Sequence, residues 1–142
     1  MLKQHGEETS SMKKILTFTL ILFSLWISTA LGAPVNDQNS AKYWYEQGNQ
    51  YDSNKNYEKA IEVYTKAIEM DPLQCSIYYR RGLSYQALSK NDLAIADFTK
   101  GLEICPESQK TSFLFGRGGT YFFLQKYELA IADFTEAINL KP

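Results

Sequence analysis

The chain has 142 residues, of which 44% are hydrophobic, 14% aromatic and 22% charged, the composition of an ordinary folded protein. Fifteen Lys and Arg face sixteen Asp and Glu, so no excess of positive charge is available for a nucleic acid backbone, and we expect no nucleic acid partner. The one histidine is His5 and the two cysteines are Cys75 and Cys105, too few for a zinc cluster or for a Ser-His-Asp or Cys-His pair. We therefore expect no metal, no cofactor and no enzymatic activity.

The N-terminal third has the pattern of a targeting segment. Residues 1–11 are polar and could be a non-native upstream leader, with translation beginning at Met12. Lys13 and Lys14 then precede nineteen uncharged residues, 15–33, that are mostly apolar at first and small at the end. A charged start, an apolar run and a small-residue cleavage site are typical of a signal peptide.

We therefore predict a signal peptide over residues 12–33, with cleavage after Gly32 or Ala33, followed by a polar linker over residues 34–40. The alternative is an uncleaved membrane anchor, because nineteen uncharged residues in a helix nearly span the ~30 Å hydrocarbon core of a bilayer. Lys13 and Lys14 hold the N-terminus in the cytoplasm in either case. The folded part is thus expected to be exported, periplasmic or secreted, and to touch a membrane only through an uncleaved segment.

Beyond the linker the chain repeats itself three times. Residues 60–68 return as residues 94–102 and again as residues 130–138, at offsets of 34 and 36 residues. The same offsets link four further sets of residues: Trp44, Tyr78 and Leu114; Gly48, Gly82 and Gly118; Tyr51, Tyr85 and Tyr121; and Pro72, Pro106 and Pro142.

Each unit has the pattern of a helical hairpin. In the first unit, Ala60, Tyr64 and Ala67 fall at spacings of three and four, which places them on one helix face. Gly48 removes a side chain where the two helices of the hairpin cross. A proline closes each second helix, because it lacks an amide hydrogen and disfavours helix in the preceding residue. Asn56 is a plausible N-cap of the second helix.

These units resemble tetratricopeptide repeats, with departures at Gly101, at Leu114 and at two extra residues near Gln109 and Lys110. The resemblance covers residues 41–142 and implies an all-α fold, a right-handed superhelical array of three antiparallel helix hairpins over residues 41–74, 75–108 and 111–142. Such repeats bury their apolar faces by stacking on one another.

In this family the first helix of each repeat lines the concave wall, and the positions not used in packing hold a peptide or partner protein. The resemblance implies these partner-binding residues: Tyr45, Asn49, Asp52, Tyr79, Arg80, Leu83, Phe115 and Phe122. Lys42, Ser76, Gln86, Ser112 and Gly119 belong to the same wall. Tyr45, Tyr79 and Phe115 are equivalent and are expected to form an aromatic row; the alternative is that these rings close gaps between hairpins.

The chaperone-adaptor branch of the family grips a peptide carboxylate with a clamp of two Lys, two Asn and one Arg. Asn49 matches one of these positions, but Tyr45, Arg80, Ser112 and Gly116 stand at the other four, so we expect no such clamp. Arg80 could still meet an acidic group, whereas its neighbour Arg81 points elsewhere.

Three further expectations concern single features. The glycine-rich run 116–119 is interpreted as close helix packing rather than a phosphate loop. Cys75 and Cys105 lie at the same pole of the second hairpin and could form a disulfide, although two helix ends can be near and still too far apart to bond. Asp97 and Asp133 repeat with the hairpin and are expected to face outward, so no carboxylate pair is singled out for catalysis.

The function predicted from the sequence is an exported, non-enzymatic interaction module that binds a peptide or partner protein on its concave face and so acts as a scaffold. The alternative is a structural unit, or a fragment of a longer repeat protein, that forms homo-oligomers through its third hairpin. An uncapped face there would expose Tyr127, Ile131, Phe134 and Ile138.

Overall fold

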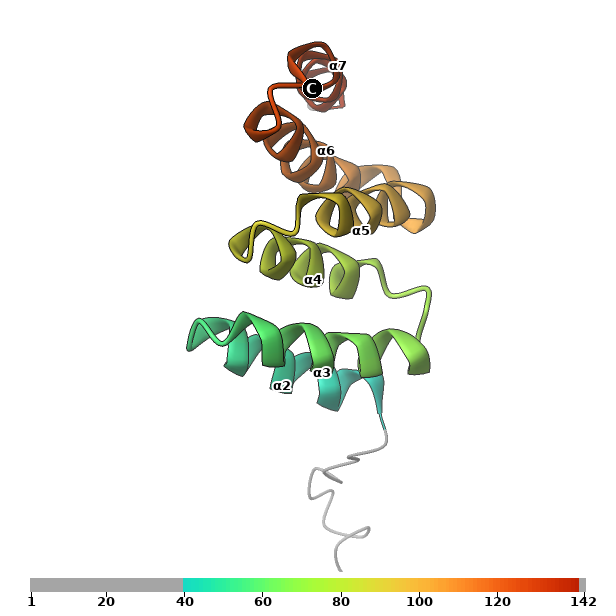
Figure 1. Ribbon diagram of the computed structural model, residues 1–142. Coiled ribbons are helices and arrows are strands. Elements are labelled where there is room, and N and C mark those ends of the chain that lie inside the picture. Colours follow the sequence, from blue (N-terminus) through green and yellow to red (C-terminus); the bar gives the residue numbers. More distant parts are fainter. Residues whose placement is uncertain (1–39, 141–142) are drawn as a thin grey trace, which may run out of the picture. The chain divides into compact units, whose positions relative to one another are not determined.

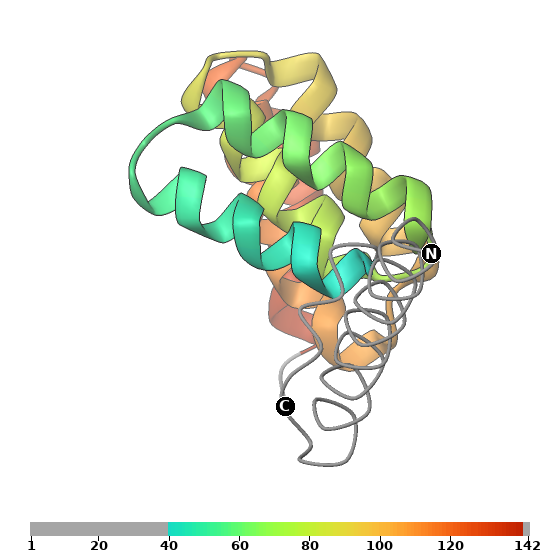
Figure 2. The same ribbon diagram turned by 90° about the horizontal axis from the view of Figure 1, so that it is seen from below.

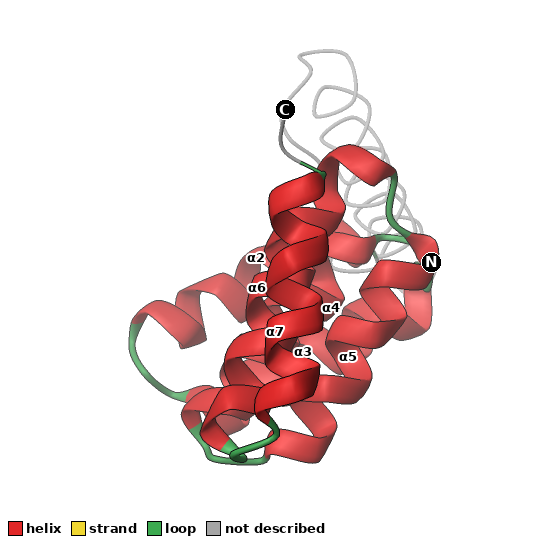
Figure 3. Ribbon diagram, turned by 90° about the horizontal axis from the view of Figure 1, so that it is seen from above, coloured by secondary structure: helices red, strands yellow, loops and turns green. Residues whose placement is uncertain are grey.

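The structure, a computed structural model, describes residues 40–140, which contain six α-helices and no strand (Figure 3). The helices are α2 (Ala41–Ser53), α3 (Tyr57–Met70), α4 (Cys75–Ala87), α5 (Asn91–Ile104), α6 (Glu107–Phe123) and α7 (Tyr127–Asn139). None of these described helices is both long enough and apolar enough to cross a membrane. The predicted leader, signal peptide or anchor, nearly all of the linker, and Pro142 lie outside the described residues.

The six helices form three antiparallel hairpins that stack in chain order, as predicted (Figure 1). Figure 2 shows the two helices of the first hairpin, α2 and α3, side by side and joined by a short turn. Among the described helices, α2 contacts α4 and α4 contacts α6, whereas no such contact joins α3 to α5 or α5 to α7. The first helices of the hairpins therefore lie on the inner side of the stack and the second helices on its outer side.

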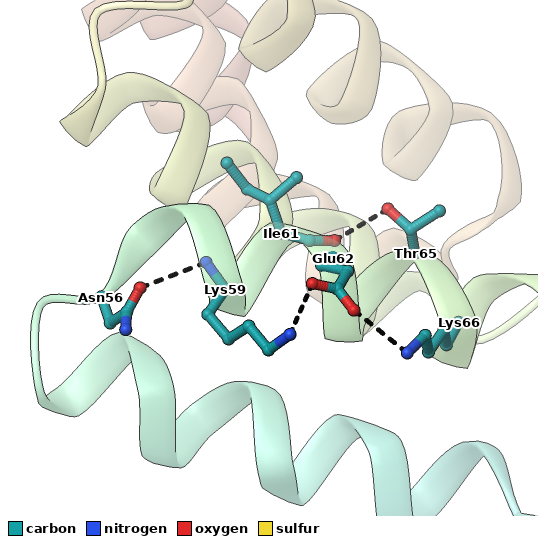
Figure 4. Close-up of polar contacts among 6 residues, drawn as sticks. All are labelled: Asn56, Lys59, Ile61, Glu62, Thr65 and Lys66. Carbon is teal, nitrogen blue, oxygen red and sulfur yellow. Dashed lines mark hydrogen bonds and ion pairs between the residues drawn. The ribbon is translucent and has the colours of Figure 1, made fainter.

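Side-chain caps fix the starts of both helices in the first hairpin. Asn56 Oδ1 accepts from the backbone N–H of Lys59 at 3.3 Å, as predicted for an N-cap (Figure 4). Ser40 Oγ accepts from the backbone N–H of Tyr43 at 3.2 Å and does the same for α2. These contacts satisfy amide groups that a helix start otherwise leaves unpaired.

All three hairpins turn in the same way, although their turn residues differ. Lys55, Ser89 and Gln125 occupy equivalent positions and have positive φ angles of 58°, 57° and 60°. The backbone N–H that follows each of them reaches back to a tyrosine carbonyl of the first helix at 2.9 Å. This pattern closes the C-terminus of a helix and usually uses glycine, which adopts positive φ at no steric cost.

The apolar core continues from one hairpin into the next. Ala60, Tyr64 and Ala67 of α3 cluster with Ile77 of α4. A second cluster joins α4 and α5 to Phe113 of α6. The first and second hairpins therefore each bury their apolar face partly against the hairpin that follows, as the repeat pattern requires.

Glycine positions confirm the close helix crossings that the sequence indicated. A Cβ atom added at Gly48 would overlap the Tyr64 ring and come within 2.9 Å of its Cζ. Gly116 and Gly118 likewise lie against the rings of Phe98 and Phe134. Gly119 has nothing within 4 Å of an added Cβ, so it is not required for packing.

The third hairpin begins earlier than its predicted boundary at residue 111. Helix α6 starts at Glu107, because Pro106, with φ −63° and ψ 152°, occupies the N-cap position and its extended backbone turns directly into the helix. The extra residues Gln109 and Lys110 are thus absorbed into an additional helical turn. The Oε1 atom of Gln109 lies 3.3 Å from Cys75 Sγ.

The two cysteines form a disulfide that ties the start of α4 to the residue after α5. The sulfur atoms of Cys75 and Cys105 are 2.06 Å apart and the Cα atoms 5.6 Å apart. Both residues are buried, and the added turn of α6 covers one of them. The bond therefore links the two open ends of the second hairpin, at the pole opposite its turn.

The expectation that Asp97 and Asp133 face outward is wrong. Each is only 5% exposed and forms a two-bond ion pair with an arginine sixteen residues earlier in the chain. Asp97 accepts from Arg81 at 2.7 and 2.8 Å, and Asp133 accepts from Arg117 at 2.7 and 2.9 Å. A buried carboxylate requires such a partner, and the arginine comes from the first helix of the same hairpin.

Candidate functional site

Four of the predicted partner-binding residues meet at the junction between the first and second hairpins: Tyr45, Asn49, Asp52 and Arg80. Asn49 of α2 is fixed by a hydrogen bond in which the Tyr64 hydroxyl donates to Asn49 Oδ1 at 2.8 Å. Burial raises the pKa of Tyr64, and the negative charge of Asp52 raises it further, so the phenol stays neutral and remains a donor. The amide oxygen of Asn49 is thus committed to the fold.

Arg80 of α4 lies exposed in the same cluster. The nearby Tyr45 side chain is the main cause that raises the pKa of Arg80, and partial burial opposes it. Asp52 accepts from the Ser84 hydroxyl at 3.0 Å, which joins α2 to α4 beside the guanidinium. Arg80 thus lies near Tyr45 and Asp52 while most of its charge remains open to solvent, an arrangement that suits an acidic ligand group.

Tyr79 and Leu83 of α4 take part in the core. The Tyr79 ring centroid lies 6.0 Å from that of Phe98 and 5.3 Å from that of Phe113. Leu83 packs against the same cluster, and both residues are half-buried. The Tyr79 ring thus fills the gap between the second and third hairpins, the alternative that the sequence left open.

The aromatic row consists of three equivalent ring pairs within the hairpins. Tyr45 lies 6.1 Å from Tyr64, Tyr79 pairs with Phe98, and the Phe115 centroid lies 5.8 Å from that of Phe134. Phe115 keeps 46% of its surface exposed. Of the three rings, it offers the most apolar area to a partner.

Phe122 does not join these residues. It is 57% exposed and lies at the end of α6, where its ring contacts Tyr127 at 5.7 Å and Phe123 at 6.5 Å. Phe123, which was not predicted as a binding residue, is more exposed and lines a pocket shared with Gln86 and Asn91. The signal was two adjacent phenylalanines at a helix end, because one helix face cannot bury both.

Sequence analysis also missed a polar contact that crosses between hairpins. Besides its ion pair with Asp97, Arg81 donates through Nη1 to the Thr65 hydroxyl of the preceding hairpin at 2.9 Å. Arg117 repeats this contact with Thr99 at 3.1 Å. Burial alone would lower the pKa of Arg81, but the hydrogen bonds and charge of Asp97 outweigh it and the pKa is raised.

A sequence signal did exist for the ion pair between the arginine and the aspartate within a hairpin. In the first unit the positions of the arginine and the aspartate hold Gln47 and Val63, so both partners are replaced together. Joint replacement indicates that the two residues depend on each other.

The side chains on the inner wall formed by α2, α4 and α6 are suited to binding a ligand. In the part of the chain that the structure describes, no three His, Cys, Asp or Glu side chains lie close enough to hold a metal ion. The inner wall combines a positioned guanidinium, amide and carboxylate groups, and partly exposed rings. Such a surface can recognise a peptide by hydrogen bonds and aromatic contact.

Comparison with known proteins agrees with this architecture. Family models described as tetratricopeptide repeat match residues 41–72, 76–108 and 111–142. A Dictyostelium discoideum protein STIP1 homolog is 39% identical over 64 residues, and rat sperm-associated antigen 1 is 32% identical over 79 residues. These matches cover 45% and 56% of this chain but only 11% and 9% of those proteins, so the chain spans about a tenth of their length.

Solved structures share the same fold. The first tetratricopeptide repeat domain of Spaghetti (RPAP3), bound to the HSP90 peptide SRMEEVD, superposes with a TM-score of 0.68 at 31% identity, covering 75% of this chain and 82% of that one. The Arabidopsis OM64 domain gives a TM-score of 0.69 at 28% identity, covering 73% and 84%. The predicted all-α solenoid of repeat hairpins is confirmed, and the chain belongs to the tetratricopeptide repeat family.

Proposed function

We propose that the chain is an exported interaction module that binds a peptide or partner protein on the face formed by α2, α4 and α6, and so acts as a scaffold for a larger complex. The observation that carries this proposal is the cluster around Arg80. Arg80 is exposed beside Tyr45 and Asp52, and its guanidinium can bind a ligand carboxylate through two parallel hydrogen bonds. Repeats of this family mediate protein–protein interaction, which sets the class of activity.

The ligand we propose is an internal peptide segment with an acidic side chain for Arg80 and an apolar side chain for Phe115. The related RPAP3 domain is bound to an HSP90 peptide. This chain keeps only Asn49 of the five clamp residues expected for a terminal carboxylate, and the Asn49 amide oxygen already accepts from Tyr64. A free carboxyl terminus is therefore not the expected determinant.

We also propose that the module works outside the cytoplasm. The charged-then-apolar pattern of residues 12–33 supports export. The buried disulfide between Cys75 and Cys105 supports it independently, because such bonds persist in oxidising compartments. N-terminal sequencing of the protein recovered from the exported fraction tests this, and recovery of an intact chain in the cytoplasm would contradict it.

The binding proposal is tested with residues 34–142 as bait, because the described helices belong to one compact unit, Gln38–Pro142. A pull-down from the exported fraction identifies partners, and titration calorimetry then compares two variants. Arg80→Gln should weaken binding about tenfold or more at an unchanged melting temperature. Lys100→Gln removes a similar exposed charge from α5 and serves as the control.

Equal binding by both variants would overturn the proposal. Tyr79→Ala is a poor probe because the ring packs between Phe98 and Phe113, so its loss lowers stability as well. Formation of homo-oligomers stays a prediction, and sedimentation at increasing concentration tests it.

A further inference from the structure

The contact between successive hairpins has a repeated chemical form. Helix α3 presents the Thr65 hydroxyl, which donates to the Ile61 carbonyl at 2.8 Å and accepts from Arg81 of the next hairpin at 2.9 Å (Figure 4 shows the first of these bonds). Helix α5 presents Thr99 to Arg117 in the same way at 3.1 Å. Each junction therefore pairs a threonine of the outer helix with an arginine of the helix that docks on it.

The docking helices share a second feature. An apolar residue stands four positions before each arginine: Ile77 before Arg81, and Phe113 before Arg117. Both apolar residues are buried, and Ile77 packs in the cluster that contains Tyr64 and Ala67 of α3. Residues four apart lie on the same helix face, so one stripe of the docking helix makes both contacts.

Helix α7 presents the same surface, but in the described part of the chain no helix docks on it. Thr135 stands at the position of Thr65 and Thr99, and no guanidinium of the described residues reaches it. Ile131 and Ile138, on the same side of α7, are 65% and 66% exposed. Phe134 is half-buried, whereas its equivalents Tyr64 and Phe98 are fully buried beneath the next hairpin. We call Ile131, Phe134, Thr135 and Ile138 the α7 end face.

The charge of α7 indicates what would cover this face. Helix α7 contains no Lys or Arg, and of its three acidic residues Asp133 is buried and paired with Arg117, so the exposed Glu128 and Glu136 carry its free charge. The position of Glu136 is Lys66 in α3 and Lys100 in α5, so a basic residue has been exchanged for an acidic one beside Thr135. Two exposed carboxylates beside an apolar stripe, with no cation on the same helix, favour a basic ligand.

We propose that the α7 end face binds an amphipathic helix of a separate partner protein, one that carries an apolar residue followed four positions later by arginine. The apolar residue packs on Ile138 and Phe134. The arginine donates to the Thr135 hydroxyl, and Glu136 supplies the negative charge. This site lies on the outer helix of the third hairpin and is independent of the proposed face around Arg80.

Two occupants from the chain itself fit less well. In α2 the equivalent pair is Tyr43 and Gln47, so a second copy docking through α2 would bring no cation to Thr135. A symmetric dimer through two α7 helices would place acidic side chains against each other. Residues 1–39 contain no arginine, and the residues four positions before Lys13 and Lys14 are Thr9 and Ser10.

The chain supplies its own probe for a test. A synthetic peptide of residues 74–88, with Cys75→Ser, carries Ile77 and Arg81. A hydrocarbon staple between positions 79 and 83, whose side chains pack toward α5 and α6 in the array, keeps it helical. Circular dichroism checks its helicity, and fluorescence anisotropy measures its binding to residues 34–142.

Two stapled control peptides carry glutamine at the position of Arg81. One is the same peptide with Arg81→Gln, and the other is residues 40–54, which hold Gln47 there, with the staple at positions 45 and 49. The proposal predicts binding of the first peptide and about tenfold or more weaker binding of both controls. Ile138→Gln in the protein should abolish binding. Leu93→Gln makes the same apolar-to-polar change at an exposed leucine of α5 and should not affect binding.

Several results would overturn the proposal. These are absence of binding by the helical peptide at millimolar concentration, equal binding of the Arg81→Gln peptide, or binding that survives Ile138→Gln. Tighter binding of the α2 peptide, or a dimer that Ile138→Gln dissociates, would assign the face to a second copy instead. None of these results bears on Arg80→Gln, so the two proposals fail separately.

Discussion

A single methyl group at Gly101 tests how closely the second and third hairpins pack. A Cβ atom there would overlap the Phe113 ring and come within 2.6 Å of its Cζ. The ring cannot move aside easily, because Phe113 is buried and its centroid lies 5.3 Å from that of Tyr79 and 6.5 Å from that of Phe98. Overpacking of this kind costs about 1–3 kcal/mol.

The expected net effect is smaller, because alanine is a better helix former than glycine by about 1 kcal/mol. Gly101→Ala should therefore give no gain in stability and a loss of up to about 2 kcal/mol. Gly119→Ala is the matched control: an added Cβ meets nothing within 4 Å, so this variant should be more stable by about 1 kcal/mol. Urea unfolding followed by circular dichroism measures both.

The first junction suggests a compensating change. There Ala67 stands at the position of Gly101 and Ile77 at that of Phe113. Phe113→Ile in the Gly101→Ala background should therefore recover stability, so that the double variant is less destabilised than the sum of the single ones by about 1 kcal/mol or more. Stabilisation by Gly101→Ala similar to that of Gly119→Ala would refute this view of the junction.

Three other outcomes can be checked with the same unfolding assay. Replacing Cys75 and Cys105 by serine should cost roughly 3–4 kcal/mol in the entropic model, since the bond closes a loop of 30 residues; a loss below 1 kcal/mol would count against it. Ser89→Gly should stabilise the second turn by about 0.5–1 kcal/mol, because its φ of 57° is strained for serine, and a loss of stability would contradict that. Burial raises the pKa of Tyr64, so the stability that its neutral phenol contributes is present below the ordinary pKa of 10.0 and is lost as the pH rises above it. Tyr64→Phe should therefore reduce the fall in stability above about pH 10, and an unchanged slope would contradict the burial of this phenol.

Much of the hairpin architecture could be predicted from the sequence because it depends on local patterns. The spacing of apolar residues in the second helices, the glycine at the crossing and the Asn56 cap each specify their own surroundings. Helix α6 was harder, because the two extra residues could lie in a loop or lengthen the helix. The helix begins directly after Pro106, so the two extra residues lengthen it.

The roles of Asp97 and Arg81 could not be read from helix periodicity. An aspartate on a buried helix face and one on a solvated face look alike in one sequence, and the difference depends on a partner sixteen residues away. For the same reason the sequence placed Asp52 and Arg80 on the inner wall but did not predict the hydrogen bond by which Ser84 of α4 donates to Asp52. Contacts between hairpins depend on the superhelical geometry, which a single repeat does not contain.

Partner binding on the inner face is tested most directly by mapping a captured partner onto the chain by NMR. Amide chemical shifts of residues 34–142, recorded with and without the partner, should change on α2, α4 and α6, with Asn49 and Arg80 among the most affected. Arg80→Gln should remove these changes, while the spectrum of the free variant stays that of a folded chain. Shifts confined to the outer surfaces of α3 and α5 would contradict the account.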